Sequence, residues 1–371
     1  MHRLIPGLLT PIIQAPMAGV TTPKLVIAAC KAGALGSHAL AFLQPSKVEA
    51  DLRETSGAIS GRPFTCNVFA IPAQVMRRDQ QEVAERAVAH LRSVLQQPEL
   101  TSDLQIPSVN SALNVPYKEH LEAIAHCPKE CRPVAVSFTF GLPDREDMQL
   151  LRDLGVVSMG TATTVEEAEA VVDAGLDVVI AQGIEAGGHR GSFQSDGQNG
   201  VGLIALVPQI VDAIENSVPV VASGGVMDRR GVAACMALGA SAVQVGTAFL
   251  LTRESQAHPA HKKVLLQTSS SNTVVSNVFS GRYARGVSNE MYRAAITFAE
   301  APVGESDCIA PYPLQQTLTN QIKQRAFAKE QFGFGSMWTG QGLGMAREGL
   351  SCEELVAELM QGVSAPGAPA R

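Results

Sequence analysis

The 371-residue chain has few charged and few aromatic side chains, and its charges are not concentrated in any segment. Charged residues make up 17% of the chain and aromatic residues 5%, with no long run of lysine and arginine. At a net charge of −6, the chain lacks the basic surface pattern of proteins that bind nucleic acids or anionic membranes. We therefore expect small-molecule partners, and neither nucleic acid nor membrane.

Long apolar runs and paired metal-ligand motifs are also absent. No apolar stretch approaches the roughly 20 residues that span a membrane, and Pro6 and Pro11 interrupt the first one, so we expect neither a signal peptide nor an anchor. The seven cysteines form no pair of Cys-x-x-Cys blocks, which favours a reduced, cytoplasmic protein. The segment HCPKEC, residues 126–131, has no second ligand pair at zinc-like spacing, so we expect no metal site there.

Short apolar runs alternate with longer helical patterns along most of the chain, which is typical of βα units and a parallel sheet. The helical stretch TVEEAEAVVDAGL begins at the capping residue Thr164, with Glu167 three residues on, and Gly175 ends it. Repetition of such units over this length predicts an α/β protein with a TIM (β/α)8 barrel. The predicted strands are PIIQAPM, FTCNVFA, PVAVSFTF, VVSMGTA, VVIAQG, PVVASGG and AVQVGTAFL.

The pattern changes after residue 251, where the sequence becomes polar and irregular. We predict a barrel over residues 1–251, a smaller inserted second domain over 252–325, and a C-terminal segment over 326–371 that returns to the barrel. The last segment contains a glycine-rich loop around Trp338, the only tryptophan, and a closing amphipathic helix capped by Ser351.

Two glycine turns follow the last two predicted strands. Gly224–Gly225 and Gly246–Thr247 each precede a predicted helix. Glycine lets backbone N–H groups approach an anion closely, and a helix N-terminus adds partial positive charge, so this pair predicts a phosphate site. Tight turning without a ligand is the alternative.

Several segments, in a fixed order, resemble the motifs of the nitronate monooxygenases, formerly called 2-nitropropane dioxygenases. They are PIIQAPMAGVTTPKLVIAACKAGALGS, CNVFA, VSFTFGLP, IAQGIEAGGHRG, VVASGGVMD, AVQVGTAFL, GRYARG and MWTGQG. The resemblance implies that the barrel binds FMN and that His189, in the GGH turn, is the general base. It also implies FMN contacts from Met17, Asn67, Gln182, Gly187, Gly188, Gly224, Gly225, Gln244, Val245, Gly246 and Thr247.

The residue types suit these roles. Side-chain amides can donate to and accept from the edge of a flavin ring, and the soft thioether of Met17 can pack on its face. An unperturbed histidine has a pKa of about 6.5, so His189 can accept a proton near neutrality, as removal of the α-proton of a nitroalkane requires. Structural roles for these polar residues are the alternative.

We also expect substrate contacts from Tyr312 and Trp338. Trp338 can equally cover the cofactor or anchor the C-terminal loop. Some bacterial members of the family follow this tyrosine with a second tyrosine and a lysine at four-residue spacings. Here those positions hold Gln316 and Asn320. We therefore expect a pocket that lacks this cation and accepts neutral or bulkier substrates.

The leading hypothesis is oxidation of alkyl nitronates, or of nitroalkanes, by FMN and O2 to a carbonyl compound and nitrite. Related flavin barrels share the EAGGH turn, so an FMN-dependent NAD(P)H enoyl-thioester or quinone reductase is the alternative, although no GxGxxG fingerprint follows a strand. A third hypothesis is an isomerase of a phosphorylated metabolite, which would bind its substrate at the two glycine turns. The sequence leaves open whether the protein is a homodimer.

Overall fold

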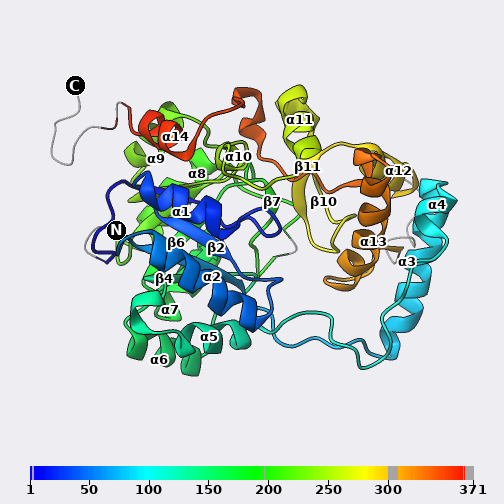
Figure 1. The fold of residues 1–371 in the computed structure, drawn as a ribbon, viewed down its shortest axis with the longest axis horizontal. Helices are drawn as coiled ribbons and strands as arrows, with labels where there is room; N and C mark the ends of the chain where they lie inside the picture. Colours follow the sequence, from blue (N-terminus) through cyan, green and yellow to red (C-terminus); the bar gives the residue numbers. More distant parts are fainter. Residues whose placement is uncertain (2–3, 196, 300–307, 362, 364–371) are drawn as a thin grey trace.

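The computed structural model describes residues 1, 4–195, 197–299, 308–361 and 363. They form a larger unit, in which helices surround a sheet, and a smaller, mainly helical unit beside it (Figure 1).

Within the described residues, eight parallel strands form the sheet of the larger unit. The sheet closes because Ile13 bridges to Leu35, and the backbone N–H of Gln14 donates to the carbonyl oxygen of Leu35 at 3.0 Å. The predicted TIM (β/α)8 barrel is therefore confirmed. In sheet order the strands are β1 (Ile12–Gln14), β9 (Ala242–Val245), β8 (Val220–Ser223), β6 (Val178–Gln182), β5 (Val157–Ala162), β4 (Ala135–Thr139), β3 (Phe64–Phe69) and β2 (Gly36–Ala39).

The sequence patterns missed β2, whose sequence GSHA contains no large apolar side chain. Small residues are needed there because α1 (Pro23–Lys31) packs directly on the strand. A Cβ atom at Gly36 would lie 2.7 Å from the carbonyl oxygen of Val26 in that helix.

Helices cover the outside of the barrel, and two of their starts were predicted from capping residues. The Thr164 hydroxyl accepts from the backbone N–H of Glu167 at 3.2 Å, and Ser351 forms a capping box with Glu354, so both predicted starts are confirmed. The helices are α1, α2 (Pro45–Ala58), α5 (Tyr117–His126), α6 (Arg145–Leu154), α7 (Val165–Asp173), α8 (Leu203–Ala213), α9 (Arg229–Ala237), α10 (Thr247–Leu250) and α14 (Cys352–Leu359). The chain also forms the 3-10 turns η1 (Lys129–Cys131), η2 (Ser270–Asn272), η4 (Phe332–Phe334) and η5 (Gln341–Met345), of which η4 packs in the small unit.

The smaller unit is built from two separate parts of the chain. Helices α3 (Asp79–Leu95) and α4 (Pro98–Thr101) leave the barrel between β3 and β4, and they share an apolar core with α12 (Glu290–Ala299) and α13 (Leu314–Ala328). The helix α11 (Pro259–Gln267) lies nearby (Figure 1). The boundaries at residues 251 and 325 stay a prediction, and this packing adds α3 and α4 to the elements of the small unit.

A three-stranded antiparallel sheet joins the two units. Its middle strand β11 (Ala284–Val287) pairs with β10 (Thr273–Ser276) on one side and with β7 (Gly188–His189) on the other. The backbone of the predicted base is therefore part of a strand that is shared between the units.

Apolar side chains fill the barrel interior at the amino ends of its strands, including Ile13, Met159, Ile180 and Val221. Ile5 belongs to the same cluster. The polar side chains that line the cavity, such as Asn67 and Gln182, lie further along their strands, toward the carboxyl ends. No helix in the part of the chain described here is long and apolar enough to cross a membrane.

Candidate active site

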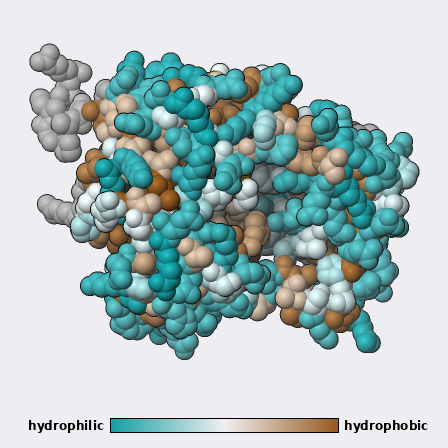
Figure 2. All heavy atoms as spheres, viewed as in Figure 1, coloured by the Kyte–Doolittle hydropathy of each residue, from teal (hydrophilic) through white to brown (hydrophobic). Residues whose placement is uncertain are grey.

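A cavity of about 1060 Å³ lies between the carboxyl ends of the barrel strands and the small unit. Figure 2 shows the surface hollowed where the two units meet. This volume is at the upper end of the range for small-molecule sites, so it can hold a cofactor together with a substrate. The predicted site residues that line it are Met17, Asn67, Gln182, Gly187, Gly188, His189, Gly224, Gly225, Gln244, Gly246, Thr247, Tyr312 and Trp338. Val245 does not line the cavity, because its side chain is 1% exposed and packs in the core.

The two glycine turns present unused backbone donors to this cavity. Within the described residues, no acceptor pairs with the backbone N–H groups of Gly224, Gly225, Gly246 or Thr247. Gly224 and Gly225 have φ values of +134° and +70°, a conformation that favours glycine. Backbone N–H groups that converge at such turns can bind an anion, so these turns are a candidate anion site.

The helix ends contribute less to this site than the sequence suggested. The Asp228 side chain accepts from the backbone N–H groups of Arg230 and Gly231 and so caps the N-terminus of α9. Helix α10, after Gly246, is a single turn of four residues. An anion at this position would therefore be held by the turns themselves.

Asn67 and Gln182 present opposite hydrogen-bonding groups to the cavity. Asn67 lies within β3, and its Nδ2 donates to Ser137 Oγ at 2.9 Å and Thr139 Oγ1 at 3.1 Å, which leaves its Oδ1 as an acceptor. Gln182 Oε1 instead accepts from Arg190 Nη1 at 3.0 Å and Gly191 N at 2.8 Å.

The amide nitrogen of Gln182 donates to the carbonyl oxygen of His189 at 3.1 Å and has one N–H left. The structure thus offers one acceptor and one donor, which is the pair that the edge of a flavin ring needs.

Buried arginines fix the turn that carries His189. Arg190 is 2% exposed, and its Nη1 also donates to the carbonyl oxygen of Gly183 at 2.6 Å. Arg285 Nε donates to the carbonyl oxygen of Ile184 at 3.0 Å. Gly187 is needed in the same turn, because a Cβ there would lie 2.5 Å from the backbone nitrogen of Gly340.

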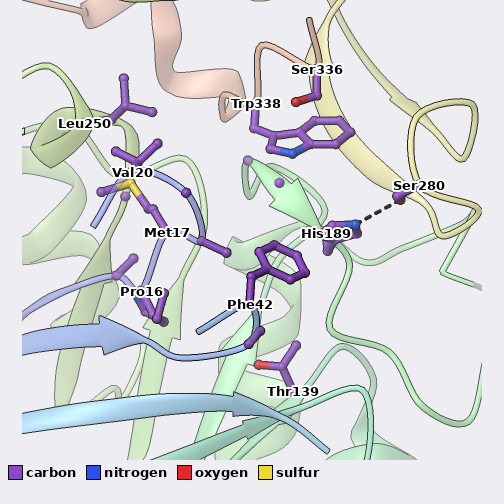
Figure 3. A pocket seen from close by; sticks show the side chains of 18 of the residues that line it. Pro16, Met17, Val20, Phe42, Thr139, His189, Leu250, Ser280, Ser336 and Trp338 are labelled. Carbon is purple, nitrogen blue, oxygen red and sulfur yellow. Dashed lines mark hydrogen bonds between the residues drawn. The ribbon is translucent and has the colours of Figure 1, made fainter. Parts of the chain in front are cut away.

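His189 is held by Ser280, a residue to which the sequence analysis gave no role. His189 Nε2 lies 2.9 Å from Ser280 Oγ, and a dashed line marks this hydrogen bond in Figure 3. The single hydroxyl proton of Ser280 is donated to the carbonyl oxygen of Arg282 at 3.0 Å, so Ser280 accepts from Nε2–H. This network assigns the imidazole proton to Nε2 and leaves Nδ1 as the proton acceptor.

The environment of His189 lowers its basicity. Burial, with the nearby positive charge of Arg282, lowers the pKa of His189 from 6.5 to about 4. The imidazole is therefore neutral at pH 7 and able to accept a proton. It is, however, a weaker base than the unperturbed histidine of the sequence argument.

Four aromatic rings surround this imidazole. The ring centroids of Phe140, Trp338, Tyr312 and Phe69 lie 5.5, 5.7, 6.0 and 6.1 Å from that of His189. Phe140 has a φ of +74°, which is unusual for a bulky residue and places strain beside the candidate base. Trp338 also contacts Phe279, with centroids 5.4 Å apart, so it both covers the cavity and anchors its loop.

The cavity contains a lysine although Asn320 stands where some family members carry one, and the expectation of neutral or bulkier substrates stays a prediction. Asn320 does line the cavity, but so does Lys323, three residues further along α13. Residues three apart on a helix lie on the same face. The positive charge of Lys323 therefore lies in the same cavity, further along the helix than position 320. Gln316 lines the cavity as well, and its Oε1 is buried without a hydrogen-bond partner among the described residues.

The model of the family described as nitronate monooxygenase matches residues 4–362. The chain belongs to this family. A nitronate monooxygenase from Pseudomonas aeruginosa PAO1 is 39% identical over 360 residues, which cover 96% of each chain. A probable nitronate monooxygenase from Bacillus subtilis strain 168 is 38% identical over 358 residues, again 96% of each chain.

A solved structure shares the fold of this nitronate monooxygenase family member. It is described as nitroalkane oxidase from Streptomyces ansochromogenes, with a TM-score of 0.80, 36% identity and 97% of each chain covered. The expectation that the chain is an enzyme is thereby confirmed. Within the described residues, no group of three or more histidine, cysteine, aspartate or glutamate side chains is arranged to hold a metal ion.

Proposed function

We propose that this family member uses FMN and O2 to oxidise alkyl nitronates to a carbonyl compound and nitrite. The observation that carries the proposal is that a neutral histidine with an available Nδ1 shares one cavity with an anion cradle and a matched amide pair. The names of the relatives from Pseudomonas aeruginosa and Streptomyces ansochromogenes support the nitro-group chemistry.

The residues present fit FMN. The N–H groups of Gly224, Gly225, Gly246 and Thr247 would bind its phosphate, and Asn67 Oδ1 with Gln182 Nε2 would bind the polar edge of its ring. Met17 lines the same cavity and packs on the apolar core (Figure 3), where its thioether can contact the ring. FMN held there would supply the electron acceptor for the nitronate and the partner for O2.

The low pKa of His189 favours nitronates over neutral nitroalkanes as substrates. A general base works best when its pKa is near the operating pH, and the pKa of His189 lies at about 4. A nitronate has already lost its α-proton and does not need this step. Its negative charge would also favour protonated His189 when bound, so the histidine can stabilise the anion in the ring of aromatic side chains.

An anaerobic experiment on purified, FMN-reconstituted protein tests the proposal. Ethyl nitronate is added to one sample and NADH to another, and the visible spectrum of the flavin is followed. Reduction by the nitronate and not by NADH is expected. Reduction by NADH alone would move the protein to the reductase class, and failure to bind FMN would contradict the assignment of the glycine turns.

A further inference from the structure

Arg190 is a buried charge beside the cavity, although its side chain does not line it. The side chain is 2% exposed, and no carboxylate oxygen of the described residues lies within 4.0 Å of its guanidinium group. Its Nε is buried without a hydrogen-bond partner in the same part of the chain. Burial lowers the pKa of Arg190 from 12.5 to about 10, which still leaves the group charged at pH 7.

The acidic groups near Arg190 are engaged elsewhere. Glu167 and Glu185 act on Arg190 electrostatically, but Glu167 accepts from the backbone N–H of Phe193 at 2.7 Å, and Glu185 accepts from the first N–H of α8 at 2.9 Å. A second buried cation, Arg285, adds positive charge to the same region. A buried charge that no contact ion pair balances is unfavourable by itself.

One side-chain amide connects this charge to the cavity. Arg190 Nη1 donates to Gln182 Oε1 at 3.0 Å, and the amide nitrogen of Gln182 has one N–H left in the cavity. Linked hydrogen bonds polarise one another, so a cation on the amide oxygen makes the amide N–H a stronger donor. The N–H of Gln182 therefore presents positive potential to a ligand in the cavity.

We propose that Arg190 is a positioning residue that acts through Gln182 to favour the reduced, anionic form of bound FMN over the oxidised form. This inference rests on the proposed function, because that function places the polar edge of the flavin ring at Gln182. A flavin that takes up two electrons and one proton carries one negative charge on its ring. A hydrogen bond strengthens when its acceptor becomes charged, so the polarised amide N–H binds the reduced ring more tightly.

The test measures the two-electron reduction potential of FMN on the enzyme, with a chemical reductant and a reference dye. Arg190→Gln removes the charge and keeps an N–H donor. It should lower the potential by about 30 mV or more, a tenfold weaker preference for the reduced form, which is the difference expected between hydrogen bonds to charged and to neutral groups. Arg190→Lys keeps the charge and should retain most of the potential.

Arg152→Gln is the matched control, because it removes a charge from the exposed surface of α6, and it should leave the potential unchanged. An unchanged potential in Arg190→Gln would overturn the inference. Equal losses in Arg190→Gln and Arg190→Lys would also overturn it, because they would leave Arg190 a structural role only.

Two further measurements decide the matter if Arg190→Gln does not fold. Gln182→Leu removes the amide and leaves Arg190 in place, so it should lower the potential to a similar extent, and an unchanged potential would overturn the inference. Wild-type enzyme is also reduced at a pH just below that at which free reduced FMN ionises. The spectrum of the anionic ring is expected, and the spectrum of the neutral ring would overturn the inference.

These readouts separate the inference from the proposed function, because none of them uses a nitronate. The expected potentials in an enzyme that does not oxidise nitronates would support the role of Arg190 and contradict the proposed function alone. Nitronate oxidation with no change of potential in Arg190→Gln would do the reverse. Failure to bind FMN would contradict both.

Discussion

Replacing Gly246 by alanine should separate FMN binding from folding stability. A Cβ atom at this position would have one neighbour within 4 Å, the Ala15 Cβ at 3.6 Å, and the φ of Gly246 is −106°. The methyl group therefore meets no clash and no left-handed strain. Replacing glycine by alanine at an unstrained site stabilises a fold by about 0.4–1 kcal/mol, because it lowers the conformational entropy of the unfolded chain.

The same methyl group would occupy space in the candidate phosphate site. If it keeps the phosphate from one backbone N–H, the loss is about 1.5–3 kcal/mol for a hydrogen bond to a charged group. The dissociation constant of FMN should then rise about 10- to 150-fold. Affinity and stability thus change in opposite directions, which few other substitutions in the cavity would produce.

The assay titrates FMN fluorescence with apo-protein and measures the free energy of unfolding in urea without FMN. Gly57→Ala is the matched control, since Gly57 is exposed in α2, and a Cβ there would have nothing within 4 Å. The control should bind FMN normally and gain stability. Unchanged FMN affinity in Gly246→Ala, with normal stability, would refute the placement of the phosphate at this turn.

Three further predictions follow from the described geometry. His189→Asn should lower kcat for nitroethane by about 100-fold or more and kcat for ethyl nitronate far less, because only the neutral substrate needs a base; equal losses in oxygen-uptake assays would contradict this. Gly187→Ala should destabilise the protein by about 1–3 kcal/mol in urea unfolding, because its Cβ would collide with the backbone of Gly340; wild-type stability would show that the turn relaxes. Burial lowers the pKa of His38 from 6.5 to about 4, so the folded protein binds fewer protons than the unfolded chain between these pH values. The free energy of unfolding should therefore fall as the pH drops from 6.5 to 4, by at most about 3 kcal/mol from this residue. His38→Gln should show a shallower fall over this range, and an identical fall would exclude His38 as a contributor.

The barrel was predictable because its strands are continuous apolar runs and its helices begin at capping residues such as Thr164 and Ser351. The β2 strand could not be predicted, because its small residues are required by the close approach of α1 and form no apolar run. The role of α3 was hidden for a similar reason. Its apolar stripe would suit a barrel helix equally well, and only three-dimensional packing shows that it joins α12 and α13.

The place of a residue in the cavity was predictable where one short motif specifies it, as for the glycine turns and the histidine of EAGGH, whose roles stay predictions. Ser280 and Lys323 could not be assigned in this way. Ser280 acts on a residue 91 positions earlier in the chain, and Lys323 enters the cavity only because α13 turns that face inward. The pKa of His189 also depends on burial and on Arg282, neither of which the sequence of the turn specifies. Cytoplasmic location and the absence of nucleic-acid partners stay predictions from composition.

The pairing of β7 with β11 has a consequence for how molecules enter the enzyme. His189 pairs with Ala284, and the backbone N–H of Arg190 donates to the carbonyl oxygen of Tyr283 at 2.9 Å. The candidate base is therefore hydrogen-bonded to β11, in the sheet that joins the two units, as well as being connected to the barrel. A rigid movement of the small unit away from the barrel would break the hydrogen bonds between β7 and β11, or it would move the imidazole of His189 away from the barrel. Opening of the cavity by rigid movement of the small unit alone is therefore disfavoured, and the backbone of His189 keeps its place between the two units.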